Sequence, residues 1–107
     1  MKRGEIWTVS TPGRQRTVLV MQADPVLEAI SSTASTILAV PLQVPEEVRI
    51  TALTPTIGRN DDGDPRYVAD VLRMGPFREP RFDERIGEVS REDLNTVAAA
   101  ICRAMAL

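Results

Sequence analysis

The chain has 107 residues, of which 43% are hydrophobic and 26% are charged, and its formal net charge is −2. This length and composition predict one ordered domain over residues 1–107 rather than a disordered chain. Because the sequence lacks histidine, has a single cysteine and contains no apolar run of the roughly 20 residues that span a membrane, we expect a cytoplasmic protein without metal, disulfide or membrane helix.

Turn signals separate three predicted strands in the first part of the chain. Residues 5–9 alternate and are rich in β-formers, and residues 10–13 favour a turn because proline fixes φ and glycine permits positive φ. Residues 17–21 form a continuous apolar run, which predicts a strand buried on both faces. A short helix is expected over residues 24–30, and a third strand over residues 36–40, ending at the proline that follows.

The middle of the chain predicts short strands around one long polar stretch. Residues 48–53 alternate apolar and polar side chains, as a half-exposed strand does. Residues 57–66 form the longest polar stretch and are expected to be a mobile loop. Strand character resumes over residues 67–74 and again over residues 85–89.

The clearest helix is predicted over residues 91–105. Ser90 is a favourable N-cap, and the acidic residues of the first turn suit the positive end of the helix dipole. Cys102 lies next to the apolar stripe of this helix and is expected to be buried. The stripe has helical spacing and consists of Leu94, Val97, Ala98, Ile101 and Met105. The whole pattern predicts a mainly β protein, in which about five to seven short strands close into a small barrel with a C-terminal helix packed against it.

Basic residues gather near the N-terminus although the chain as a whole is slightly acidic. The first 22 residues contain four basic residues and one acidic residue. This distribution is consistent with a positive surface on an acidic body, and equally with an ordinary mixed surface.

Two motifs near the N-terminus are more specific than these patterns. Residues 3–7 read Arg-Gly-Glu-Ile-Trp, and residues 16–22 read Arg-Thr-Val-Leu-Val-Met-Gln. Together they resemble the opening of the MazF/PemK toxins, which are small ribonucleases of bacterial toxin–antitoxin systems. The resemblance covers residues 3–43 and 67–106, and it is poor over residues 44–66.

The resemblance implies an SH3-like β-barrel of the CcdB/MazF/PemK toxin type, assembled as a homodimer. The C-terminal helix and the strand over residues 36–40 are candidate dimer contacts. The resemblance also implies an endoribonuclease that cleaves single-stranded mRNA without a metal ion or other cofactor. A cognate antitoxin is expected to inhibit it. In this reaction the 2′-hydroxyl of the RNA attacks the neighbouring phosphate and leaves a 2′,3′-cyclic phosphate and a 5′-hydroxyl. The enzyme must orient the hydroxyl and stabilise charge on the phosphoryl oxygens, and it needs no nucleophile of its own.

Arg16 is the residue to which the resemblance assigns the scissile phosphate, because the family's catalytic arginine heads the second strand. A guanidinium suits this role, since it stays protonated and its planar fork gives two charge-assisted hydrogen bonds to phosphate. The alternative is a strand-edge charge with no catalytic role. The resemblance also implies RNA contacts for Arg14, Gln15 and Thr17, and Lys2 is a further candidate. Ordinary turn polarity and a frayed terminus are the alternatives for these residues.

The sequence departs from the family at the catalytic positions. The second catalytic residue of the family, a threonine that ends the third strand, falls at Gln43, whose amide can orient a phosphate but cannot act as a base. The first loop, residues 10–15, lacks the glutamate that is the candidate base in many members, and Thr17 stands where many have proline. We predict a positioning role for Gln43, with weak or altered cleavage as the alternative to full activity.

Other functions remain open on the sequence. One is a family member that dimerises and binds an antitoxin but has lost cleavage. Another is a CcdB-like toxin that binds DNA gyrase, although the chain lacks the terminal tryptophan of that group. A third is a barrel adaptor unrelated to toxins, if the two N-terminal motifs are coincidental.

Overall fold

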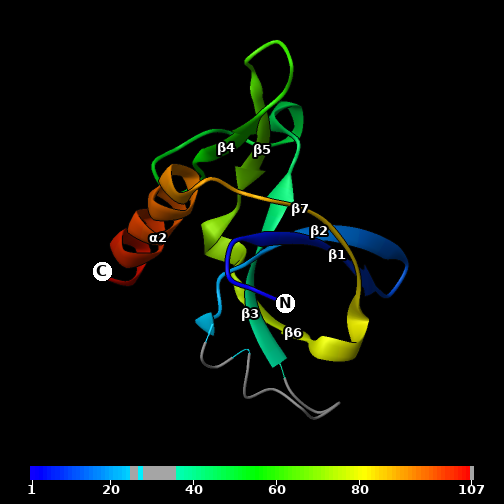
Figure 1. The fold of residues 1–107 in the computed structure, drawn as a ribbon. Coiled ribbons are helices and arrows are strands. Elements are labelled where there is room, and N and C mark those ends of the chain that lie inside the picture. Colours follow the sequence, from blue (N-terminus) through cyan, green and yellow to red (C-terminus); the bar gives the residue numbers. More distant parts are fainter. Residues whose placement is uncertain (25–26, 28–35, 107) are drawn as a thin grey trace.

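The computed structural model describes residues 1–24, 27 and 36–106 (Figure 1). The helix expected over residues 24–30 falls for the most part outside the described residues.

A seven-stranded antiparallel sheet dominates the described chain. Its order is β4-β5-β3-β2-β1-β7, and β6 pairs with β3. The strands are β1 (Glu5–Thr11), β2 (Arg14–Val20), β3 (Thr36–Gln43), β4 (Thr56–Arg59), β5 (Pro65–Ala69), β6 (Gly75–Arg78) and β7 (Phe82–Glu88). The helices are the 3₁₀ turns η1 (Pro45–Glu47), η2 (Val71–Arg73) and η3 (Glu79–Arg81) and the α-helix α2 (Arg91–Met105). The predicted class, mainly β with a C-terminal helix, is confirmed.

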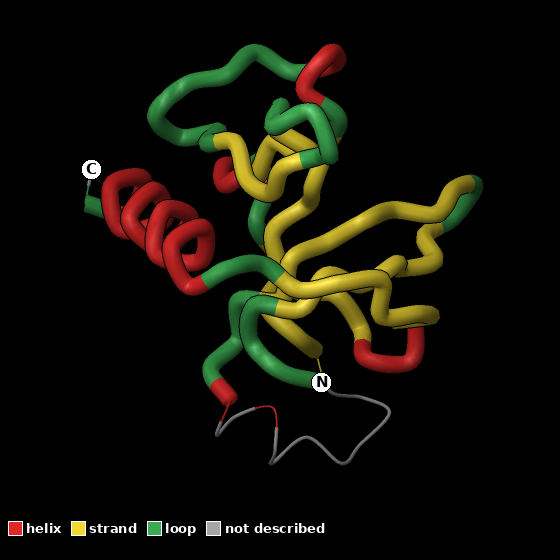
Figure 2. Tube along the Cα trace, turned by 45° about the horizontal axis from the view of Figure 1, so that its top comes forward, coloured by secondary structure: helices red, strands yellow, loops and turns green. Residues whose placement is uncertain are grey.

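The sheet curls on itself like an open barrel, with α2 at the end opposite the β1–β2 turn (Figures 1 and 2). Two register shifts between β1 and β7, at Ile6/Trp7 and at Thr8/Val9, act as bulges that increase the bend. Among the described residues no ladder joins β7 to β4 or β6. The barrel predicted from the sequence is therefore present as a curled sheet rather than as a closed cylinder.

Strand β2 is buried on both faces, as its continuous apolar run predicted. Val18, Leu19 and Val20 are all 0% exposed. Leu19 packs under α2 in the cluster that contains Val97, whereas Val18 packs inside the curl against Trp7. This central strand is therefore a rigid base for the side chains at its N-terminal end.

The prediction of a strand over residues 48–53 is wrong. Only an isolated bridge between Thr51 and Thr54 forms there. The Thr54 hydroxyl donates to the carbonyl of Arg49 (2.8 Å) and accepts from the backbone N–H of Thr51 (2.7 Å). These local side-chain bonds close a tight turn, and they satisfy backbone groups that a ladder would otherwise use.

The prediction of a loop over residues 57–66 is also wrong, because β4 and β5 form a hairpin there. Asn60 builds the turn, since its side-chain oxygen accepts from the backbone N–H of Asp62 and of Asp64, each at 3.0 Å. Gly63 has a φ of 83°, which glycine adopts without strain. The polar residues are thus the turn chemistry of a hairpin.

Strand β3 continues through Pro41 to Gln43, three residues beyond the predicted end. Proline lacks a donor for the ladder, but the Pro41 carbonyl accepts the backbone N–H of Asp70 at 2.9 Å. The strand predicted over residues 67–74 is shorter than expected, because β5 ends at Ala69 and η2 follows. Both differences matter for the site, since they bring Gln43 and Asp70 together.

The helix α2 forms over residues 91–105 and is capped as predicted, with the Ser90 hydroxyl accepting the backbone N–H of Asp93 (3.1 Å). Val97, on the buried face of the helix, is 0% exposed. The predicted stripe does not stay buried to its end, because Met105 is 75% exposed. Cys102 is exposed, so the expectation that its thiol is buried is wrong. No helix in the described ranges is long and apolar enough to cross a membrane.

Candidate functional site

A polar pocket of about 230 Å³ opens where β2 begins and β3 ends. Most of the residues that the sequence nominated meet here, although they come from separate segments of the chain. The pocket is lined by Arg14, Gln15, Arg16, Thr17, Pro41, Leu42, Gln43, Val44, Glu47 and Arg73. Three arginines thus face one carboxylate, which makes this surface locally basic within an acidic protein.

The register of β2 and β3 sets Arg16 against Gln43. The last paired residues of the ladder are Thr17 and Leu42. One step further along the same register, Arg16 stands directly opposite Gln43. Directly opposed residues of an antiparallel pair project from the same face with Cβ atoms about 5 Å apart. Both side chains are half-buried and line the pocket.

The Arg16 guanidinium is available for an anion. Its Nε is buried and has no hydrogen-bond partner among the residues that the structure describes. Within those residues it also takes part in no ion pair shorter than 4 Å. A buried donor without a partner costs free energy, so an acceptor that enters the pocket gains from pairing with it.

Asp70 anchors Gln43 from behind the pocket. The Gln43 amide nitrogen Nε2 donates to Asp70 Oδ2 at 3.2 Å, and Arg73 Nε lies 3.4 Å from the same oxygen. Asp70 is 7% exposed. A carboxylate accepts but does not donate, so this contact fixes which end of the amide faces Asp70. It restricts Gln43 to a defined orientation at the pocket.

Sequence reasoning missed Asp70, Arg73 and Glu47. A signal for Asp70 was present, because it is a charged residue inside the apolar run from Val68 to Leu72, and buried charges need partners. Glu47 lies in the segment where the family resemblance is poor, and only the fold brings it to this pocket.

The remaining nominated residues differ in their placement. Arg14, Gln15 and Thr17 line the pocket with Arg16. The Gln15 side chain also donates to Asp83 Oδ2 at 3.4 Å. Lys2 does not line the pocket, and its backbone N–H donates to Glu5 Oε1 at 2.8 Å. An RNA contact by Lys2 stays a prediction.

Glu5 gives the first N-terminal motif a structural role. Its carboxylate accepts from Trp7 Nε1 (3.1 Å) and Arg85 Nε (2.8 Å), as well as from the backbone of Lys2. Burial raises the pKa of Glu5, but these hydrogen bonds outweigh it and hold the pKa below its ordinary value. The motif therefore ties β1 to β7 and to the N-terminus.

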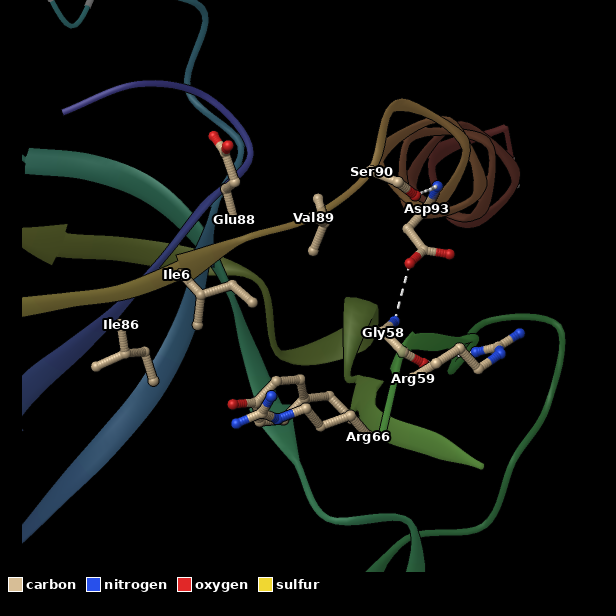
Figure 3. A pocket seen from close by; sticks show the side chains of 11 residues that line it. Ile6, Gly58, Arg59, Arg66, Ile86, Glu88, Val89, Ser90 and Asp93 are labelled. Atoms are coloured by element: carbon tan, nitrogen blue, oxygen red, sulfur yellow. Dashed lines mark hydrogen bonds between the residues drawn. The ribbon is translucent and has the colours of Figure 1, made fainter. Parts of the chain in front are cut away.

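A second pocket, of about 360 Å³, lies between the β4–β5 hairpin, β7 and the start of α2 (Figure 3). The Arg66 guanidinium carbon lies 5.6 Å from the centre of the Tyr67 ring. The Asp93 carboxylate accepts the backbone N–H of Gly58 at 2.8 Å and so joins the helix to β4 (Figure 3). None of the residues nominated from the sequence lines this pocket.

Comparison with known proteins gives a family and a fold. Residues 2–105 match the model of the PemK-like, MazF-like toxins of type II toxin–antitoxin systems. No curated protein sequence matches the chain.

Solved structures share the whole fold at low sequence identity. A mycobacterial endoribonuclease in complex with its cognate antitoxin aligns with a TM-score of 0.81 and 17% identity, over 100% of this chain and 96% of that one. The Mycobacterium tuberculosis toxin MazF-mt6 aligns with a TM-score of 0.74 and 18% identity, over 96% and 97%. The MazE–MazF complex of Deinococcus radiodurans aligns with a TM-score of 0.77 and 14% identity, over 100% of this chain and 96% of that one.

Proposed function

The chain belongs to the family of PemK-like, MazF-like toxins of type II toxin–antitoxin systems, and we propose that it is an endoribonuclease that cleaves single-stranded mRNA without a metal ion. The observation that carries the proposal is the Arg16 guanidinium, unpaired at its buried Nε and facing Gln43 across a basic pocket. Solved proteins of the same fold are named as endoribonucleases.

The proposed reaction is an internal transesterification of RNA. The 2′-oxygen forms a bond to the adjacent phosphorus, the bond from phosphorus to the 5′-oxygen breaks, and the products end in a 2′,3′-cyclic phosphate and a 5′-hydroxyl. Charge grows on the non-bridging oxygens on the way. Arg16 stabilises it with charge-assisted hydrogen bonds inside a partly buried pocket, where such bonds are stronger than in water.

Gln43 positions the phosphate or the attacking hydroxyl. Its amide has donors and an acceptor and is oriented by Asp70. Arg14, Gln15 and Thr17 hold the RNA backbone on either side of the cleaved bond, and Lys2 adds a contact away from the pocket. Phosphate contacts of this kind position RNA without reading its sequence.

A cognate antitoxin and a second copy of the chain complete the proposal. An acidic antitoxin segment that covers Arg14 and Arg16 blocks the RNA site, because opposite charges favour that contact. The candidate dimer contact over residues 36–40 stays a prediction; β3 is already paired with β2 over residues 39–42 and with β6 over residues 36–39. The face of α2 and η2 is better suited, because Leu72 (67% exposed) and Met105 (75% exposed) leave apolar surface there.

A weakly active or inactive toxin is the second candidate function, and Gln43 is the observation that favours it. Glutamine is longer than the threonine expected at this position and its amide is held by Asp70. The gyrase-binding alternative gains nothing from the family match.

Digestion of RNA tests the proposal. Purified protein is incubated in EDTA with a long single-stranded RNA, and the fragment ends are analysed. Discrete fragments with 2′,3′-cyclic phosphate and 5′-hydroxyl ends are the expected result. Intact RNA, at protein concentrations where the fold is verified by circular dichroism, contradicts the proposal and favours the inactive toxin.

A further inference from the structure

We propose that Glu47 is the general base of the reaction, an inference that rests on the proposed function. The first loop of this chain lacks a carboxylate, and Gln43 cannot accept a proton from a hydroxyl. Glu47 is the one carboxylate among the described residues that line the pocket of Arg16 and Gln43. The fold thus supplies, from a different segment, the chemical group that the loop does not carry.

The turn after β3 brings Glu47 back to the pocket. Val44 is extended, with φ −75° and ψ 143°, and Pro45 then starts the 3₁₀ turn η1 with its fixed φ. The backbone N–H of Glu47 donates to the Val44 carbonyl at 3.1 Å and closes the turn. The Glu47 carboxylate is therefore attached to a short, constrained segment that begins two residues after Gln43.

The charges around Glu47 suit a base that works beside a phosphate. Arg14 and Arg16 face it from β2, and Arg73 faces it from η2. In the described part of the chain Glu47 makes no ion pair within 4 Å. Glu47 is also exposed, so its carboxylate is open to a hydroxyl group that enters the pocket.

Asp70 is the other carboxylate near the site, and its environment does not suit this role. It is 7% exposed, does not line the pocket, and its Oδ2 already accepts from Gln43 and lies beside Arg73. A general base must reach the proton that it removes. Asp70 acts instead as a positioning residue, through the Gln43 amide.

The proton balance of the step is complete with water. Glu47 takes the proton of the 2′-hydroxyl as the 2′-oxygen bonds to phosphorus. The 5′-oxygen leaves with the electron pair of its bond to phosphorus and takes a proton from water. Glu47 then returns its proton to the solvent, so that no oxidant, reductant or metal is needed.

Glu47→Gln is the test, with Glu46→Gln as its matched control, since Glu46 lies on the same turn but does not line the pocket. Removal of a general base typically costs 10²–10⁴-fold in rate. We expect Glu47→Gln to lower kcat on single-stranded RNA by about 100-fold or more with KM little changed, and Glu47→Asp to lie between. Wild-type kcat/KM is expected to fall at low pH, and Glu47→Gln is expected to lose that fall.

The outcomes separate this inference from the proposed function. If the wild type leaves RNA intact, the proposed function fails and the inference fails with it. If the wild type cleaves and Glu47→Gln keeps its kcat and its pH profile, only the assignment of Glu47 is overturned. A Glu47→Gln variant that changes KM alone also overturns it, because that result describes charge repulsion of RNA and not proton transfer. Binding of a non-cleavable RNA with a 2′-deoxy cleavage site checks that the variant is folded and binds normally.

Discussion

Arg16 and Gln43 occupy opposing positions one step beyond the last paired residues of β2 and β3, and both line the same basic pocket. The rigid part of the ladder, with Val18 and Leu19 fully buried, ends just before them. Both side chains are therefore fixed at the base by the sheet, and the Gln43 amide is also oriented by Asp70. This is the arrangement that phosphate positioning requires, since catalytic groups gain from being oriented before the substrate binds.

The contribution of Gln43 can be measured by substitution. We expect Gln43→Ala to lower kcat by about 10²-fold, because removal of one preorganised donor near a developing oxyanion costs that much. Gln43→Thr is expected to cleave at the wild-type rate or faster, since threonine gives a hydroxyl at the same strand end. Single-turnover cleavage of a labelled RNA measures both. Equal rates for all three proteins would show that Gln43 has no role in the reaction.

Asp70 is predicted to serve both stability and catalysis. Asp70→Ala leaves the Gln43 amide and Arg73 without their acceptor, so we expect the free energy of unfolding to fall by about 1–3 kcal/mol. We expect kcat to fall as well, because Gln43 loses its fixed orientation. Urea denaturation and RNA cleavage give the two values.

Arg73→Ala is the control for Asp70. The Arg73 side chain is 70% exposed, and exposed ion pairs contribute less than about 1 kcal/mol. A loss of stability in Arg73→Ala as large as that in Asp70→Ala would contradict the assignment of Gln43 as the main partner of Asp70.

The lowered pKa of Glu5 predicts how the free energy of unfolding depends on pH. Hydrogen bonds hold the pKa of Glu5 in the folded protein below the ordinary value of 4.5. The contribution of Glu5 to the free energy of unfolding is therefore complete above that ordinary value. It is lost as the pH falls through the lower, folded-state pKa. Glu5→Gln places an amide N–H₂ against Arg85, so we expect it to cost about 1–2 kcal/mol at pH 7 and progressively less in acid.

Denaturation of wild type and Glu5→Gln between pH 7 and about pH 3 measures this difference. The gap between the two curves should narrow as the pH falls. A gap that stays constant, or that grows in acid, would be inconsistent with the ion pair between Glu5 and Arg85.

Local patterns in the sequence predicted the parts of the fold whose structure depends on neighbouring residues. The apolar run of β2 and the Ser90 cap of α2 are of this kind, because each depends on residues within one element. The β4–β5 hairpin was missed since its turn depends on the side chain of Asn60, and a polar stretch alone does not distinguish such a turn from a loop.

The site was predicted only in part for a similar reason. Arg16 and Gln43 were nominated by resemblance, and the register then showed that they face each other. Asp70 and Glu47 join them only because β3 runs past Pro41 and is followed by η1, so that distant segments meet. Such contacts depend on tertiary pairing, which periodicity along the chain does not encode.

The RNA cleavage rate of the Arg16→Ala variant tests the central role assigned to Arg16 most directly. The variant is compared in EDTA with the wild type and with Arg91→Ala, which removes an exposed arginine from the start of α2. We expect Arg16→Ala to lose at least about 10²-fold in kcat, with an unchanged thermal melting curve, and Arg91→Ala to keep the wild-type rate. A folded Arg16→Ala protein that cleaves RNA at the wild-type rate would contradict the account.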